Sequence, residues 1–419
     1  MSKFVKLSSI AELTVGFVGT MAKHYEDEGI PFLRSLNIKP FKIISDDMKY
    51  VSAEFSNSLS KSILHKGDVV IVRTGIPGTC CVVPAEYDGC NCSDVVIVHP
   101  NTELVNPHYL AAYINFWGQR QIQNNKVGAI QQHFNVHSAE EMLIFLPDIT
   151  EQEKIAKTIV ALNGKIENNF SVCVELEAMA KTLYDYWFTQ FDFPDENGKP
   201  YCSSGGEMVW NDQLKREIPK GWDTATINEM TKSCRGVSYD KNDLLPSPEN
   251  GVLVLRGNNI QNNRLVYDNN VAYVPHSLVA KEQQISAHDI ILTMSSGSKD
   301  HIGKCTMFQY DSPHTYGAFL TKFTPDKDKV GFVYLSMISD FFKKKVKAIC
   351  NGTGINNLTN EIFDNLIFPK PTEAVLARFE ETISPMFEKM GVCERENEEL
   401  TKLRDWLLPM LMNGQATVE

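Results

Sequence analysis

The stretch LRSLNI at residues 33–38 returns as LRGNNI at residues 255–260, about 220 residues further along the chain. A second short stretch repeats at nearly the same spacing: DVVIV at 68–72 returns as DIILT at 289–293. Short runs of β-branched residues between turn-forming residues are typical of buried strands. The 419-residue chain is therefore predicted to contain two copies of one strand-rich unit.

A long amphipathic helix is expected after each copy. After Pro147, and again after residue 371, apolar residues recur at alternating spacings of four and three, which is typical of a coiled-coil seam. The matched registers favour antiparallel pairing of the two helices over two separate helices, each docked on its own domain. The register also predicts that the polar seam residue Asn169 faces Cys393, and that Asn397 faces Cys173. The residues predicted to serve helix pairing or subunit docking are Ile155, Ile159, Leu162, Ile166, Leu176, Leu183, Phe379, Ile383, Met386, Met390, Leu400 and Leu407.

The predicted fold is α+β, with two pseudo-twofold-related strand-rich domains joined by two long antiparallel coiled-coil helices. A helix of this length spans roughly 50 Å at about 1.5 Å per residue. One turn of B-DNA is about 34–36 Å long, so such helices suit a spacer between two half-sites on one duplex. The predicted segments are a first domain (1–146), a central helical region (147–190), a linker (191–222), a second domain (223–370) and a C-terminal helical region with its tail (371–419).

The net charge of −11 does not argue against nucleic-acid binding once it is divided along the chain. Residues 1–146 carry −2 and residues 207–370 carry +1, whereas 147–206 and 371–419 carry −5 each. The acidic excess therefore belongs mainly to the helical segments. No apolar stretch is long enough to span a membrane, and the N-terminus lacks a signal peptide, so a cytoplasmic protein is expected. The ten scattered cysteines are expected to be reduced and packed as small apolar residues.

The chain shows little sign of chemistry of its own. An adenine methyltransferase needs an [N/D]-P-P-[Y/F] tetrad, but 106–109 read NPHY, which the start of a helix explains. His133 and His137 have the spacing of two metal ligands on a helix, but no Glu follows His133 and the preceding residues resemble a loop. We therefore expect no metal, no cofactor and no catalytic residue in this chain.

Six stretches carry a resemblance to a known family. They are PDITEQEKI (147–155), YDYWF (184–188), FDFP (191–194), NGKPY (197–201), EIPKGW (217–222) and LRDWLLP (403–409). With the duplication, they make the whole chain resemble the specificity subunit of type I restriction-modification systems. One departure is that Ala374 stands in the second helix where the first has Gln152.

The resemblance implies a DNA-binding protein without catalytic activity. Each half would be a target-recognition domain that reads one half of a bipartite, asymmetric target in double-stranded DNA. The helices would set the gap and dock two methyltransferase subunits, and motor-nuclease subunits would complete the restriction enzyme. S-adenosylmethionine would be held by the methyltransferase. The alternatives are a stand-alone DNA methyltransferase or nuclease, and a coiled-coil scaffold with no role on DNA.

Candidate DNA contacts are loop-like positions with side chains suited to bases or phosphates. In the first half they are Arg34, Asn37, Arg73, Thr74, Lys126, Gln131 and Gln132. In the second half they are Arg256, Asn258, Asn259, Ser295, Ser296, Lys299, Lys343, Lys344, Thr353, Asn356 and Asn357. Two alternatives stay open, because the LRxxNI stretches can be structural turns and the lysine run at 343–347 can be a solvated helix face.

Overall fold

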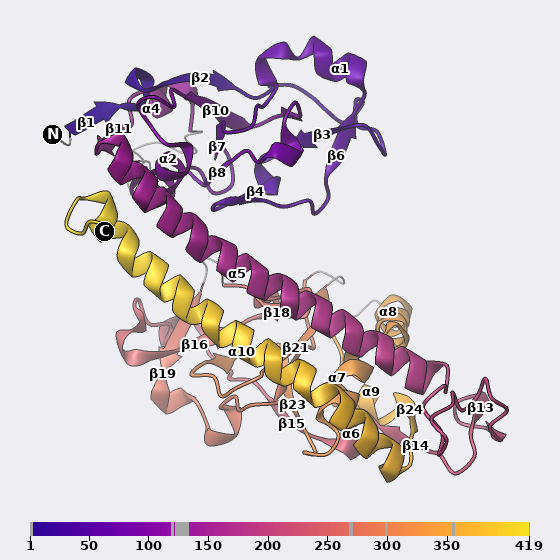
Figure 1. Cartoon of the computed structure of the whole chain (residues 1–419). Coiled ribbons are helices and arrows are strands. Elements are labelled where there is room, and N and C mark those ends of the chain that lie inside the picture. Colours follow the sequence, from indigo (N-terminus) through magenta and orange to yellow (C-terminus); the bar gives the residue numbers. More distant parts are fainter. Residues whose placement is uncertain are drawn as a thin grey trace. The chain divides into compact units, whose positions relative to one another are not determined.

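The computed structural model describes residues 3–118, 121, 134–267, 271–297, 301–353 and 357–418. Its contacts divide the chain into two compact units. The first unit comprises Met1–Asn169 with Glu396–Glu419, and the second comprises Phe170–Arg395. Each unit thus contains one strand-rich half and a part of each long helix (Figure 1). The five segments predicted from the sequence divide the chain more finely and stay a prediction.

The first unit is built on a four-stranded antiparallel sheet of order β2-β10-β7-β8. A three-stranded sheet, β6-β3-β9, and two ribbons, β1-β11 and β4-β5, complete it. The strands are β1 Lys3–Lys6, β2 Ala11–Val15, β3 Ile30–Leu33, β4 Ile38–Lys39, β5 Lys42–Ile43, β6 Lys49–Val51, β7 Val69–Val72, β8 Cys80–Val82, β9 Asn91–Cys92, β10 Val95–Pro100 and β11 Leu143–Leu146.

The second unit contains four sheets that repeat this topology. Their orders are β15-β23-β20-β21, β19-β16-β22, β14-β24 and β17-β18. The predicted duplication is therefore confirmed in the fold. The strands are β14 Asp223–Thr226, β15 Thr231–Arg235, β16 Gly251–Leu255, β17 Ile260–Gln261, β18 Arg264–Leu265, β19 Ala272–Pro275, β20 Ile290–Thr293, β21 Cys305–Met307, β22 Thr315–Tyr316, β23 Leu320–Pro325 and β24 Ile367–Lys370.

The repeated runs DVVIV and DIILT contain the buried strands β7 and β20. All four residues of each strand are buried, because helices cover one face of the sheet and further strands cover the other. In β7, Val69 and Ile71 belong to a core with α2 (Pro107–Tyr113), whereas Val70 and Val72 pack with Leu33 of β3. This two-sided burial explains why neither run alternates apolar and polar residues.

The two long helices are α5, Ile149–Tyr184, which a π-helical turn extends to Thr189, and α10, Glu373–Met412 (Figure 1). In the first unit Asn163 accepts a hydrogen bond from Arg404 (3.0 Å), and Ile166 O accepts one from Asn397 (3.1 Å). In the second unit Cys173 Sγ lies 3.6 Å from Met390 O, and Tyr184 packs against Phe379. Residue numbers rise along one helix as they fall along the other, so the predicted antiparallel pairing is confirmed within each unit.

The predicted partners in the seam were wrong. Asn169 faces Asn397, with its Nδ2 3.0 Å from Asn397 Oδ1, and the thiols of Cys173 and Cys393 are in contact. The prediction confused positions that correspond in the repeat with positions that touch. In an antiparallel pair the facing residue numbers have a constant sum, which brings amide to amide and thiol to thiol.

The remaining helices are short, and one hairpin lies in the linker. The helices are α1 Ala53–Ser58, α4 Val136–Glu140, α6 Ile227–Met230, α7 Val330–Ile338, α8 Asp340–Thr353 and α9 Asn360–Asp364. The hairpin joins β12, Met208–Asn211, to β13, Arg216–Pro219. Within the described part of the chain, no helix has the length and apolar character needed to cross a membrane.

Candidate nucleic-acid interface

Several strand ends of the second unit meet at one edge. Backbone hydrogen bonds join the end of β15 to the start of β23 (Gly236 N to Leu320 O, 3.1 Å) and the end of β22 to the end of β16 (Gly317 N to Leu255 O, 2.9 Å). The end of β20 joins them through Met294 N, which donates to Phe319 O at 2.9 Å. We call this edge the second sheet-end surface, and its side chains are Arg235, Tyr239, Arg256, Ser295, Phe319 and Asn357.

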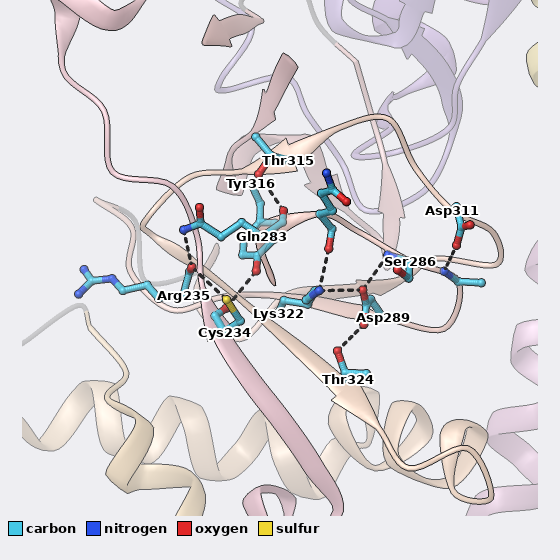
Figure 2. Close-up of polar contacts among 12 residues, drawn as sticks. Cys234, Arg235, Gln283, Ser286, Asp289, Asp311, Thr315, Tyr316, Lys322 and Thr324 are labelled. Atoms are coloured by element: carbon cyan, nitrogen blue, oxygen red, sulfur yellow. Dashed lines mark hydrogen bonds and ion pairs between the residues drawn. The ribbon is translucent and has the colours of Figure 1, made fainter. Parts of the chain in front are cut away.

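Arg235 ends β15 and is exposed. Its Nε donates to Ala318 O at 3.0 Å, and its own carbonyl accepts a hydrogen bond from Gln283 Nε2 at 3.1 Å. Figure 2 shows its guanidinium pointing away from the buried polar residues that lie beside it. The backbone and Nε of Arg235 are thus fixed, while the outer edge of its guanidinium group stays accessible.

A buried ion pair supports this strand end. Lys322 Nζ lies 3.1 Å from Asp289 Oδ2, and the two side chains are only 11% and 1% exposed. Lys322 also donates to Gln284 O (2.7 Å), and Asp289 also accepts hydrogen bonds from Ser286 N and Thr324 Oγ1 (Figure 2). A buried pair is tolerated when further hydrogen bonds satisfy both partners, as they do here. The pair therefore anchors the segment that contains Gln283 next to Arg235.

Phe319 is the large apolar side chain of the second sheet-end surface. Its carbonyl accepts hydrogen bonds from Met294 N (2.9 Å) and Ser295 N (3.2 Å), yet its side chain is 67% exposed. Ser295 also forms a β-bridge with Asn357, an exposed residue. An aromatic ring on a fixed backbone is therefore placed among polar groups.

The repeated LRxxNI stretches place their Arg and Asn residues differently. Asn37 and Asn259 are 0% and 3% exposed, and each side-chain oxygen accepts the backbone N–H of the preceding arginine, Arg34 or Arg256. Their amide nitrogens donate to backbone carbonyls, among them Ile44 O and Val266 O. This placement favours the structural-turn alternative for the two asparagines.

The two arginines of these stretches are half-buried and each has a partner. Arg34 forms an ion pair with Asp47 (2.9 Å), and hydrogen bonds from Lys49 and Arg34 lower the pKa of that carboxyl group. Arg256 donates from Nε to the hydroxyl group of Tyr239 at 3.0 Å. Asn258, also a candidate, is exposed in the turn that follows Arg256.

The equivalent edge of the first unit carries different side chains. Strand register places Arg73 where the second unit has Met294, and Asp94 where it has Phe319. Arg73 donates from Nε to Phe134 O (3.2 Å), and Thr74 follows it as a half-buried residue. The two units therefore share the arrangement of strands at this edge, but the side chains on it differ.

The remaining candidates lie on α8, next to Ser295, or outside the described residues. Lys343 and Lys344 are exposed on α8, whose opposite face buries Phe342 and Val346, and neither lysine forms an ion pair with a described residue. Thr353 ends α8, and Ser296 is half-buried beside Ser295. Lys126, Gln131, Gln132, Lys299 and Asn356 lie outside the described residues.

Two motifs tested for chemistry have structural explanations. Asn106 caps α2, with its side-chain oxygen accepting hydrogen bonds from His108 N and Tyr109 N. His137 lies on α4, is 81% exposed and pairs with Glu140, whereas His133 is outside the described residues. Among the residues that the structure describes, no three His, Cys, Asp or Glu side chains gather where they could hold a metal ion.

All twelve residues predicted for helix pairing or docking are buried or half-buried. Several other apolar residues of the helices are exposed, among them Met179 (53%) on α5, and Leu403 (43%) and Trp406 (60%) on α10. These three lie outside the seam pattern, so the apolar periodicity does not predict them. Arg235 and Phe319 were not predicted either, because the first half has Val15 and Asp94 at the corresponding positions and the repeat gives no signal there.

Comparison with known proteins places both units in one family. The model of the type I restriction modification DNA specificity domain matches residues 2–177 and 219–379. The type I restriction enzyme StySPI specificity subunit of Salmonella potsdam is 29% identical over 208 residues, which are 48% of this chain and 44% of that protein. The match thus spans less than half the length of that relative. The HindI specificity subunit of Haemophilus influenzae is 23% identical over 88% of this chain and 91% of its own length.

A solved structure shows the same fold. The S subunit of a type I restriction-modification system from M. genitalium matches with a TM-score of 0.55 and 15% identity, covering 98% of this chain and 96% of that one. The family model covers most of the chain and matches both of its halves. The chain therefore belongs to the family of type I restriction-modification DNA specificity proteins.

Proposed function

We propose that the chain is the sequence-specific DNA-binding subunit of a type I restriction-modification complex. It recognises a bipartite, asymmetric target and directs the adenine methyltransferase and the restriction subunits to it. One observation carries this proposal: the same strand ends meet at an edge in each unit, but the side chains on the two edges differ. Two identical frames with different side chains suit a target whose two halves have different sequences.

In this proposal one set of side chains contacts the DNA bases and another set binds the phosphates. Arginine recognises guanine, and Ser and Asn can contact several bases, so Arg73, Arg256, Ser295 and Asn357 are suited to base contact. Lysines bind phosphates without regard to sequence. Lys343 and Lys344, exposed on α8, are suited to this anchoring role. Replacing both by Ala should weaken binding to every DNA sequence and reduce the slope of log affinity against log salt by about 2.

Methylation mapping tests the function directly. Adenine methylation is mapped across the genome in cells with this chain and in cells from which it is deleted. Loss of one gapped, two-part motif on deletion is the expected result, and the motif supplies the target sequence. An unchanged methylation pattern would overturn the proposal, and methyl transfer by the purified chain alone would favour an enzyme instead. We expect S-adenosylmethionine to bind to the methyltransferase partner and not to this chain.

Docking of two methyltransferase subunits is proposed for the helices. The exposed apolar side chains Met179, Leu403 and Trp406 offer contact area that the helix pair itself does not use. Exposed tryptophans are frequent energetic centres of protein interfaces. We expect Trp406→Ala to weaken co-purification with the methyltransferase, while Lys402→Ala, an exposed residue of the same helix, leaves it unchanged.

The seam provides a second test of docking. Leu162→Asp with Leu176→Asp should also abolish assembly, by separating the helices on which the partner rests. Both leucines are half-buried, so each aspartate would place a charge in the helix pair. Stoichiometric co-purification of this double variant would contradict docking on the paired helices.

A further inference from the structure

We propose that Arg235 and Phe319 read neighbouring base pairs of the half-site bound by the second unit, Arg235 a guanine and Phe319 the methyl group of a thymine. This inference rests on the proposed function. It deepens that function by assigning base chemistry to two residues that lie outside the repeated motifs.

The backbone and Nε of Arg235 are held by hydrogen bonds, whereas the outer edge of its guanidinium group is accessible. Its Nε donates to Ala318 O (3.0 Å), and its backbone carbonyl accepts a hydrogen bond from Gln283 Nε2 (3.1 Å). These two bonds fix the backbone and the orientation of the side chain. No carboxylate among the described residues pairs with its guanidinium, which is exposed. The outer edge of a guanidinium can donate to O6 and N7 of guanine, the commonest specific contact in the major groove.

Phe319 lies directly after the carbonyl that Arg235 binds. Phe319 is 67% exposed, and exposure of a large apolar residue to water is unfavourable unless a partner covers it. The two hydrogen bonds to its carbonyl, from Met294 N and Ser295 N, fix the backbone, so little conformational entropy is lost when the ring is covered. In the major groove the apolar group available to such a ring is the C5 methyl group of thymine.

The first unit does not offer this combination. Its corresponding positions hold Val15 and Asp94, and an aspartate would repel the DNA backbone unless it accepted a hydrogen bond from a base. The pair of Arg235 and Phe319 therefore belongs to one half-site only. Because Ala318 joins the two residues, the guanine and the thymine should be in neighbouring base pairs.

Base analogues test the two contacts atom by atom. The full chain is assembled with its methyltransferase and bound to a duplex with the target obtained by methylation mapping. Each thymine is replaced in turn by uracil, which lacks only the methyl group, and each guanine by 7-deazaguanine, which lacks the N7 acceptor. We expect one uracil to weaken binding about fourfold and one 7-deazaguanine to weaken it about tenfold, both in the same half-site.

Variants connect each effect to its residue. Phe319→Ala should lose the uracil effect and keep the 7-deazaguanine effect, whereas Arg235→Ala should do the opposite. Phe319→Leu, which retains an apolar side chain, should keep part of the uracil effect. Trp210→Ala removes another exposed aromatic residue (61%), on the β12–β13 hairpin, and should keep both effects.

Each outcome supports or overturns the inference. It is overturned if no uracil in the target weakens wild-type binding, if Phe319→Ala stays as sensitive to uracil as the wild type, or if the sensitive bases lie in different half-sites. If the wild-type complex does not prefer the target to a scrambled duplex, the proposed function itself fails. Preference for the target without any effect of the analogues would overturn this inference alone.

Discussion

Asn169 of α5 donates its side-chain amide to the side-chain oxygen of Asn397 in α10, with the nitrogen and oxygen 3.0 Å apart. The same amide nitrogen lies 2.7 Å from Glu396 Oε2, and Asn397 donates in turn to Ile166 O at 3.1 Å. Asn169 is only 3% exposed. A shifted register would bury these amides without partners, so the pair favours one alignment of the helices.

We expect Asn169→Leu to lower the free energy of unfolding by about 1–3 kcal/mol, because Asn397 loses a buried partner. Urea denaturation of the full chain measures the change. Replacing both asparagines by leucine should restore stability but weaken the register, since apolar residues pack in several alignments. A single variant as stable as the wild type would show that the amide pair contributes nothing to folding.

The contact between Cys173 and Cys393 gives an independent measure of register. Burial raises the pKa of the Cys173 thiol to about 11, so the thiolate is scarce at pH 8. We expect iodoacetamide to modify Cys173 at pH 8 far more slowly in the folded chain than in denaturant, and mass spectrometry of peptides measures this. The half-buried Cys202 is the control. Equal rates for Cys173 in the two conditions would contradict the helix pairing.

The duplication made the frame predictable, and the differences between the copies made the site hard to predict. Repeated strands and helix registers follow from apolar periodicity, which is a local property of the sequence. Asn37 and Asn259 recur because each closes a turn with its amide, so their repetition reflects folding. Arg235 and Phe319 do not recur, and only strand pairing over more than 80 residues brings them together. The Asn169–Asn397 pairing was mispredicted because the repeat indicates equivalence and not contact.

Glu380 of α10 binds the start of a neighbouring helix, as Gln152 of α5 does. Ala374, which stands at the position that corresponds to Gln152, cannot form such a hydrogen bond. In the first unit Gln152 is fully buried and accepts the Asn106 N–H (2.9 Å), next to the start of α2. In the second unit Glu380 accepts the N–H groups of Gly331 (3.1 Å) and Phe332 (2.7 Å) at the start of α7. The signature glutamine is thus replaced by a carboxylate further along the helix.

Stability should depend on pH through Glu380. Burial, assisted by the nearby Asp328, raises its pKa from 4.5 to about 7. Between about pH 4.5 and 7 the folded state then keeps a proton that the unfolded state releases, so stability falls as pH rises through this range. In the wild type this loss amounts to about 2–3 kcal/mol between pH 5 and pH 8, and we expect Glu380→Gln to remove it because the glutamine side chain does not titrate. Urea denaturation at pH 5 and pH 8 measures it, and equal pH dependence in variant and wild type would exclude this carboxyl group as the cause.

The buried pair of Lys322 and Asp289 should be the most sensitive polar contact of the second unit. Lys322→Met leaves Asp289 buried without its cation, which typically costs about 3–5 kcal/mol. Lys232→Met is the matched control, because Lys232 is exposed on β15, the strand that pairs with β23. We expect hydrogen exchange to accelerate in residues 283–292 with Lys322→Met and to stay unchanged with Lys232→Met.

Lys322→Met should also weaken discrimination of the guanine assigned to Arg235, because Gln283 donates a hydrogen bond to the carbonyl of Arg235. Normal protection and normal discrimination in Lys322→Met would show that this pair neither stabilises the segment nor positions the arginine.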